Sequence, residues 1–221
     1  MLYGLEDARA NVRNRDGKRV FYLGKGDQLT SDARDWLSRE RIEVLPADKA
    51  RPERYRLLSG GFLEEKPENM THLFGDVLVE KTHPRIAFRG AMDCLEAEIL
   101  LCALEVPKWE KELTELLQLA RTLLRCEVMG EPVAETPLGG LDAKALRQRS
   151  HRPQDFYGQP HFMPAVSDGA AVLRLNRVRC AVRRTELAAV AAMPDREDMI
   201  RALNRMSSFV YLLMIREKTN N

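Results

Sequence analysis

Five arginines lie close together in one apolar stretch of the 221-residue chain. They are Arg174, Arg177, Arg179, Arg183 and Arg184. Arg179 and Arg183 are four residues apart, so a helix projects both from one face, where like charges oppose helix formation by about 0.2–0.5 kcal/mol unless an anion compensates them. Because a guanidinium group matches phosphate and carboxylate geometry, the stretch predicts a polyanionic partner. The alternative is a solvated helix face with a local Arg183–Glu186 ion pair, worth only tenths of a kcal/mol.

A second polar group lies in the last helical pattern of the chain. Asn204, Ser207 and Ser208 share one stripe beside an apolar seam. An amide and two hydroxyls at this spacing could bind a ligand's sugar or base edge. The alternative is a polar edge that neighbouring helices satisfy.

A third group surrounds the start of a predicted helix at Pro84. Lys81 and Arg85 lie where free backbone N–H groups and the helix dipole favour phosphate. Arg89 and Asp93 follow at a spacing that suits an ion pair within the helix. Alternatively, Asp93 reaches an arginine of the basic stretch and holds its guanidinium group rigid.

Composition and spacing argue against several classes of protein. The 35 basic residues nearly balance the 33 acidic ones, which argues against non-specific adhesion to nucleic acid or membrane. No apolar run approaches the ~20 residues of a membrane span, and the charged N-terminus is unlike a secretory signal. The four cysteines form no Cys-x-x-Cys pair, so we expect free, buried thiols in a reducing cytoplasm. The four histidines lack the paired spacing of a metal site, so no protein-bound metal is expected.

Helical periodicity dominates the chain from Pro84 onward and predicts a mainly α protein. The expected helices span residues 84–104, 107–128, 141–149, 169–193 and 195–215. Proline, glycine and aromatic residues predict a loop at 151–168. Together these elements predict a bundle of about five helices within a domain at 71–221.

The N-terminal region has a different pattern. Residues 1–48 predict a small β-α-β appendage, with strands at 19–23 and 42–44 around a helix that Thr30 or Ser31 caps. Residues 49–70 carry prolines and glycines among charges. They predict a linker or mobile loop.

In their order along the chain, these motifs resemble those of the ATP:corrinoid adenosyltransferases of the propanediol-utilisation type. The motifs are Lys-x-x-x-Arg at 81–85, Gly-x-x-Asp at 90–93, Arg-x-x-x-Arg-Arg-x-Glu at 179–186 and Leu-Asn-Arg-x-Ser at 203–207. The ethanolamine-utilisation relatives are more similar still, through residues 29–34, 71–73, 84–93, 130–132 and 202–207. The resemblance covers most of the chain. It implies an adenosyltransferase-like helical bundle, a homo-oligomeric trimer or dimer in which ATP and cobalamin meet at a subunit interface.

The resemblance also implies a role for each matching residue. ATP contacts would come from Lys81, Arg85, Arg183, Arg184, Glu186 and Asn204. Asp93 would pair with Arg179 and order the site, so that Asp93, Arg179 and Arg183 would serve catalysis. Mg²⁺ would bridge the phosphates and keep waters and substrate oxygens as ligands.

Cobalamin binding would require an apolar group that replaces its lower axial ligand and so eases reduction of Co(II). The predicted loop supplies Phe162 as the candidate, with Tyr157 behind it, although an aromatic in such a loop also serves as a packing anchor. The resemblance adds a flavoprotein reductase and ethanolamine ammonia-lyase as partners. It also adds a bacterial microcompartment as an alternative location within the cytoplasm.

The chain departs from the family pattern in two places. The usual nucleotide loop rich in Thr, Gly and Asp is reduced to Gly75-Asp76. Many ethanolamine-type relatives carry a His followed by a Cys-Cys-x-x-Cys metal cluster, but residues 50–70 contain no cysteine. We therefore expect an enzyme that works without an iron or zinc site. The rival hypothesis is a non-catalytic helical bundle that binds a nucleotide or a corrinoid.

Overall fold

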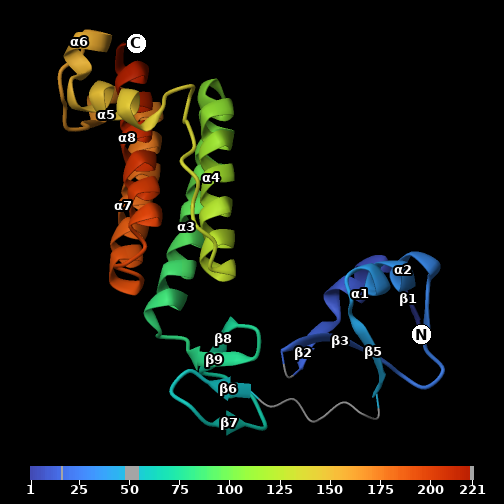
Figure 1. Cartoon of the computed structure of the whole chain (residues 1–221). Coiled ribbons are helices and arrows are strands. Elements are labelled where there is room, and N and C mark those ends of the chain that lie inside the picture. The colour runs from blue at the N-terminus through green and yellow to red at the C-terminus, as the bar shows by residue number, and fades with distance from the viewer. Residues whose placement is uncertain (16, 48–54, 220–221) are drawn as a thin grey trace. The chain divides into compact units, whose positions relative to one another are not determined.

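The protein consists of two compact units, Met1–Lys81 and Thr82–Asn221, in a computed structural model that describes residues 1–15, 17–47 and 55–219. Figure 1 shows the chain with its helices and strands labelled. Strands occur only in the first of these units, among the residues described, and all the long helices belong to the second.

The N-terminal part of the first unit is a small α/β structure. Its elements are β1 (Leu2–Tyr3), α1 (Leu5–Ala10), β2 (Val12–Arg15), β3 (Lys18–Leu23), β4 (Gln28–Leu29), α2 (Ser31–Arg39) and β5 (Glu43–Pro46). Strand β3 pairs in parallel with β5 and antiparallel with β2, while β1 pairs with β4. The hydroxyl of Thr30 caps α2 by accepting the Ala33 N–H at 3.3 Å. The structure thus confirms the predicted strand–helix–strand arrangement.

A four-stranded sheet follows in the order β7-β6-β9-β8. The strands are β6 (Tyr55–Leu57), β7 (Phe62–Leu63), β8 (Met70–Phe74) and β9 (Val77–Glu80). The linker or mobile loop predicted at 49–70 is therefore corrected from residue 55 onward, whereas 48–54 lie outside the described residues. Strands of two or three residues are too short for alternation to reveal them among turn residues. The predicted nucleotide-loop remnant, Gly75-Asp76, is the turn between β8 and β9.

Four long helices dominate the second unit and lie side by side (Figure 1). They are α3 (Pro84–Glu105), α4 (Glu110–Met129), α7 (Gly169–Ala192) and α8 (Glu197–Thr219). The shorter elements are η2 (Pro107–Trp109), α5 (Ala143–His151), α6 (Pro153–Tyr157) and η3 (Val166–Asp168). The mainly α class and the long helices are confirmed. The loop predicted at 151–168 contains α6 and η3, so six α-helices replace the expected five among the residues described in this unit.

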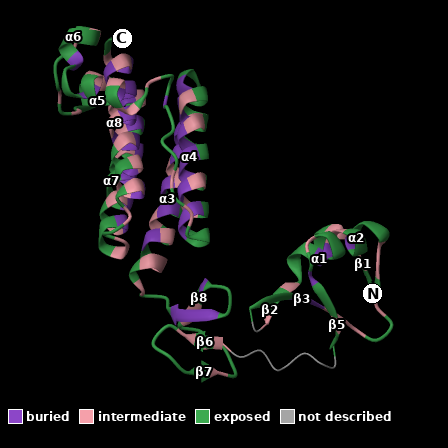
Figure 2. Cartoon of the chain, viewed as in Figure 1, coloured by how far each residue is buried: buried purple, intermediate pink, exposed green. Residues whose placement is uncertain are grey.

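Apolar stripes on the long helices form one shared core, visible as their inward purple faces in Figure 2. The predicted seam of α8 is fully buried: Met199, Leu203, Met206, Val210 and Leu213. Truncating a buried leucine of this kind to alanine costs about 2–5 kcal/mol. The core therefore fixes which face of each helix remains available for a ligand.

The cysteines differ in part from the prediction. All four are free, but Cys94 and Cys180 are exposed, while Cys102 and Cys126 are buried. Burial raises the pKa of the Cys102 thiol to about 11, so this thiol stays protonated near neutral pH. In the described part of the chain, no helix combines the length and the apolar character needed to span a membrane.

Candidate functional site

The five arginines of α7 fall into two sets. Arg174 and Arg177 turn toward α3, where their Nε atoms lie 2.7 Å from carboxylate oxygens of Glu105 and Glu98 respectively. These ion pairs neutralise the charges of the two arginines and join α7 to α3. They are partly exposed, so each contributes about 0–1 kcal/mol to stability. Their function is structural.

The other three arginines have no carboxylate partner among the residues described. Arg183 and Arg184 are exposed, whereas Arg179 is half-buried, with its guanidinium carbon 5.1 Å from the ring centroid of Tyr211 on α8. The Nε of Arg179 is buried and has no hydrogen-bond partner. Leaving a buried donor unsatisfied costs about 1–3 kcal/mol. This N–H is therefore a donor that an anionic or carbonyl oxygen would satisfy.

Glu186 and Asn204 meet across the interface of α7 and α8. The Nδ2 of Asn204 donates a hydrogen bond to Oε1 of Glu186 at 3.1 Å. The alternative predicted a local ion pair between Arg183 and Glu186. That pair does not form among the described residues, so Arg183 has no carboxylate partner there. Arg183 lies between Arg179 and Glu186 along α7. Helix α7 thus carries the unpaired Arg183 three residues before Glu186, whose side chain is held by Asn204.

The serines of the predicted stripe are less accessible than expected. Ser207 is buried, and the Oγ of Ser208 donates to the carbonyl of Asn204 at 3.2 Å. Only the Asn204 side chain remains exposed on this stripe. Ser208 is therefore hydrogen-bonded within α8 itself, and neither a neighbouring helix nor a ligand is needed to satisfy it.

Asp93 does not meet Arg179 within one chain. Its side chain is exposed on α3, and no described residue forms an ion pair or side-chain hydrogen bond with it. Arg179 instead faces Tyr211. The predicted ion pair between Arg89 and Asp93 is also absent, because Arg89 turns to α4.

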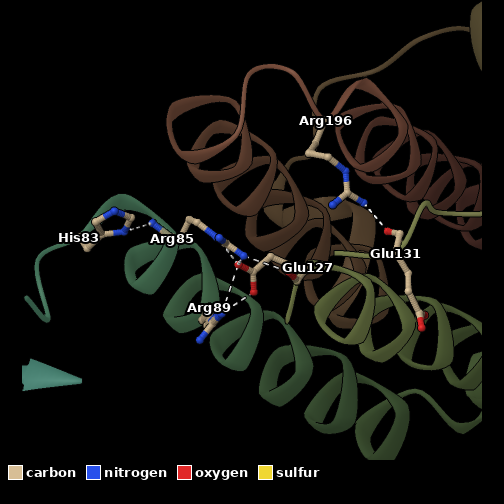
Figure 3. A network of polar contacts seen from close by, with 6 residues as sticks. All are labelled: His83, Arg85, Arg89, Glu127, Glu131 and Arg196. Carbon is tan, nitrogen blue, oxygen red and sulfur yellow. Dashed lines mark hydrogen bonds and ion pairs between the residues drawn. The ribbon is translucent and has the colours of Figure 1, made fainter. Parts of the chain in front are cut away.

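Arg85 and Arg89 grip one buried carboxylate, that of Glu127 near the end of α4 (Figure 3). Nε of Arg85 lies 2.5 Å from Oε1 of Glu127, and Nε of Arg89 lies 2.7 Å from Oε2. The Nη2 of Arg85 also donates to the backbone carbonyl of Glu127 at 3.0 Å. The backbone N–H of Arg85 donates to Nδ1 of the His83 ring. The Arg85 guanidinium, predicted to bind phosphate, is therefore occupied in the structure. The other predicted phosphate ligand, Lys81, ends the first unit and is exposed.

Sequence reasoning missed Glu127, although one signal was present. Glu127 lies four residues after the buried Leu123, on the apolar stripe of α4. A carboxylate on such a stripe requires a cationic partner, since burying an unpaired charge is costly. The identity of that partner, about forty residues away, follows only from the fold.

The aromatic candidates lie on two different faces of α8. Phe162 packs against Tyr211 with ring centroids 6.0 Å apart, and the Lys218 Nζ lies 4.6 Å from the Phe162 ring. Tyr157 instead lines a pocket of about 330 Å³ together with Phe209 and Arg149. Tyr211, which sequence reasoning missed, is seven residues after Asn204 and therefore on the same helix face. It connects Phe162 with Arg179.

A second pocket, of about 90 Å³, lies where α5 and the segment 133–136 meet α8. Asp198 lies at its edge, where Oδ2 accepts the Val133 N–H at 2.8 Å and Arg196 forms an ion pair at 2.9 Å. The hydrogen bond from Arg196 holds the pKa of Asp198 well below its usual range. Arg196 also donates to the Glu131 carbonyl at 2.7 Å (Figure 3). These contacts hold the segment that follows α4 in place. They also account for the lowered pKa of Asp198, so no ligand is needed to explain it.

Comparison with known proteins adds a family to this geometry. A family model described as cobalamin adenosyltransferase matches residues 62–217, which is more than half of the chain. A corrinoid adenosyltransferase EutT of Salmonella typhimurium is 33% identical over 158 residues, and one of Escherichia coli K12 is 32% identical over 158 residues. Each alignment covers 68% of this chain but 59% of the relative. The chain therefore matches less than two thirds of the length of these curated relatives.

Proposed function

Because this chain belongs to the cobalamin adenosyltransferase family, we propose that it transfers the 5′-deoxyadenosyl group of ATP to cob(I)alamin. The products are adenosylcobalamin and triphosphate, and the adenosylcobalamin serves ethanolamine degradation. One observation carries the proposal at the level of the site. Arg179, Arg183 and Arg184 have no carboxylate partner in the described chain, although two neighbouring arginines of the same helix do.

The reaction needs charge stabilisation more than acid–base chemistry. The electron pair of Co(I) forms the bond to the 5′ carbon of ATP, and the carbon–oxygen bond breaks with its pair retained by triphosphate. Guanidinium groups aimed at the departing oxygens lower the barrier because negative charge develops there. Arg179, Arg183 and Arg184 fill this role, while Asn204, held by Glu186, contacts the nucleoside. Lys81 supplies a further phosphate contact.

Mg²⁺ enters with the nucleotide in this proposal. It prefers oxygen ligands and keeps several waters, so phosphate oxygens satisfy it without a dedicated protein cage. Arg85 has a positioning role instead of direct contact with phosphate, because Glu127 holds its guanidinium group. This assignment differs from the one that the motif alone favoured.

The active protein is a homo-oligomer in this proposal, and Asp93 of one copy pairs with Arg179 of another. Asp93 is exposed without a partner in the described chain, and Arg179 has a buried donor without an acceptor. An ion pair between Asp93 of one copy and Arg179 of a second copy would give each of these groups a partner. Further along α3, three leucines are exposed, Leu100, Leu101 and Leu104, of which Leu104 is 80% exposed. Apolar groups of this kind favour contact between subunits.

Cobalamin binds beside Phe162 in this proposal, whereas Tyr157, which lines a pocket on another face of α8, is the alternative aromatic contact. Both are half-buried, so each can expose an apolar surface to a ligand while its other side packs on α8. A flavoprotein reductase supplies the electron for Co(II), and ethanolamine ammonia-lyase uses the product.

One assay tests the proposed function directly. ATP, Mg²⁺ and chemically reduced cobalamin are mixed with the protein, and formation of the cobalt–carbon bond is followed by absorbance. We expect adenosylcobalamin and one triphosphate per turnover. Binding of ATP and cobalamin without adenosylcobalamin would support the non-catalytic bundle instead, and no binding of either would refute both.

A further inference from the structure

We propose that Tyr211 is a positioning residue that couples the segment carrying Phe162 to Arg179, because both are held by the one side chain and the subsites of both substrates depend on it. The assignment of the two subsites rests on the proposed function. The coupling itself rests on contacts of Tyr211 alone. Its hydroxyl holds the segment, and its ring holds the arginine.

The hydroxyl of Tyr211 lies at the centre of a chain of three hydrogen bonds. It accepts the backbone N–H of Phe162 at 3.1 Å and lies 3.2 Å from Nδ1 of His161, whose Nε2 lies 3.3 Å from the His151 carbonyl. With the His161 proton on Nε2, every donor meets one acceptor: Phe162 N–H to Oη, Tyr211 O–H to Nδ1, and Nε2–H to the carbonyl. One hydroxyl therefore fixes both residues 161 and 162.

The ring of Tyr211 makes a separate set of contacts. It stacks on the ring of His161, with centroids 5.7 Å apart and planes 9° apart, and packs against Phe162. The guanidinium group of Arg179 lies 5.1 Å from its centroid. Because Arg179 has no carboxylate partner in the described residues, this cation–π contact is what positions it within one chain. The ring of Tyr211 is therefore in direct contact with the Arg179 guanidinium group.

The two sets of contacts separate the effects of two substitutions. Tyr211→Phe removes the hydroxyl and keeps the ring, so the segment 161–162 loosens while Arg179 stays in place. Tyr211→Leu removes both. We expect Tyr211→Phe to raise the KM for cobalamin roughly two- to tenfold, the range of one hydrogen bond, and to leave the KM for ATP unchanged. Tyr211→Leu is expected to raise both.

Tyr22→Phe is a matched control, because it removes a tyrosine hydroxyl that only accepts a 3.4 Å bond from Arg15 in the first unit. Its kinetic constants should equal those of the wild type. Thermal unfolding of all variants is measured in parallel. Equal effects of Tyr211→Phe on both KM values, or a fall in kcat alone that follows the loss of stability, would overturn the assignment.

Hydrogen–deuterium exchange tests the coupling without any substrate. The peptide containing the Phe162 amide should exchange roughly two- to tenfold faster in Tyr211→Phe than in the wild type or Tyr22→Phe. Arg179→Ala should also speed this exchange, whereas Arg183→Ala should not, since only Arg179 contacts the ring. Unchanged exchange in Arg179→Ala would overturn the coupling, whereas a wild type that forms no adenosylcobalamin would overturn the proposed function.

Discussion

Arginines of a single helix differ in role according to whether a carboxylate lies opposite them. Arg177 meets Glu98 of α3, while Arg183, six residues later, meets none in the described chain. Sequence alone identified both as basic, but could not separate them, because their possible partners lie about eighty residues away. The sequence assigned Glu186 and Asn204 separately to the nucleotide, but it did not predict the hydrogen bond between them. Tyr211 and Glu127 were missed because an aromatic or a carboxylate in a helical stripe has no distinctive local signature.

The two arginines give a matched test at the residue scale. Arg183→Ala should lower kcat for adenosyl transfer by roughly 10²–10³-fold, the cost of removing one oxyanion ligand. Arg177→Ala should change turnover less than threefold, since an exposed pair contributes little. Both are measured by adenosylcobalamin formation, with circular dichroism to confirm the fold. Equal activity of Arg183→Ala and wild type would remove Arg183 from the site.

Contacts between elements hold the start of α3 against the end of α4. Glu127 receives two guanidinium groups from the first two turns of α3, and so ties that helix start to the last turn of α4 (Figure 3). The long helices themselves were predictable, because apolar residues recur along them at helical spacing. Helix α6 was not predictable, since a helix of five residues that begins at Pro153 and ends before Gly158 has no period to detect.

Replacing Glu127 by glutamine should therefore weaken the junction of α3 and α4. We expect the free energy of unfolding to fall by about 2–3 kcal/mol, because a buried charge pair loses one partner. Glu96→Gln is the control: Glu96 also joins α3 to α4, 3.0 Å from Arg121, but that arginine is 59% exposed. Its loss should cost less than about 1 kcal/mol. Urea unfolding of both variants measures the difference, and equal midpoints would contradict the special role of Glu127.

The turn at Gly139-Gly140 offers a second test at this scale. Both glycines have left-handed backbone conformations, with φ of 56° and 74°. A Cβ on Gly139 would lie 2.6 Å from the Phe209 ring, whereas one on Gly140 would meet nothing within 4 Å. Gly140→Ala should cost about 1–2 kcal/mol from backbone strain alone. Gly139→Ala should cost about 1–3 kcal/mol more, from the clash with a buried ring. Thermal unfolding of the two variants measures the difference. Identical melting temperatures would mean that the Phe209 ring moves aside at no cost.

The whole molecule combines a helical unit that matches the family with a first unit whose N-terminal α/β part precedes the match. The family model begins at residue 62, within the four-stranded sheet, and continues into α8. The β-α-β pattern was predictable because its strand, cap and helix signals lie close together. The sheet at 55–80 was not, since its strands are short. This sheet contains no cysteine.

The proposed pairing of Asp93 with Arg179 between copies predicts complementation. Asp93→Asn and Arg179→Ala should each abolish most activity when assayed alone. Mixed and reassembled one to one, they should recover about a quarter of wild-type activity, because one site in four combines an intact Asp93 with an intact Arg179 in a symmetric ring or dimer. Mixing either variant with itself is the control. No recovery after confirmed subunit exchange would place the two residues in separate roles.

Under the proposed function, the lack of carboxylates opposite Arg183 and Arg184 in the described chain also governs how a catalytic cycle ends. The groups that stabilise the departing triphosphate hold it just as well once it has left, and nothing on α7 in the described chain takes its place. Free triphosphate should therefore compete with incoming ATP. Under this proposal, product inhibition and an advantage for any phosphatase that clears the product follow from the same cationic face that stabilises the leaving group.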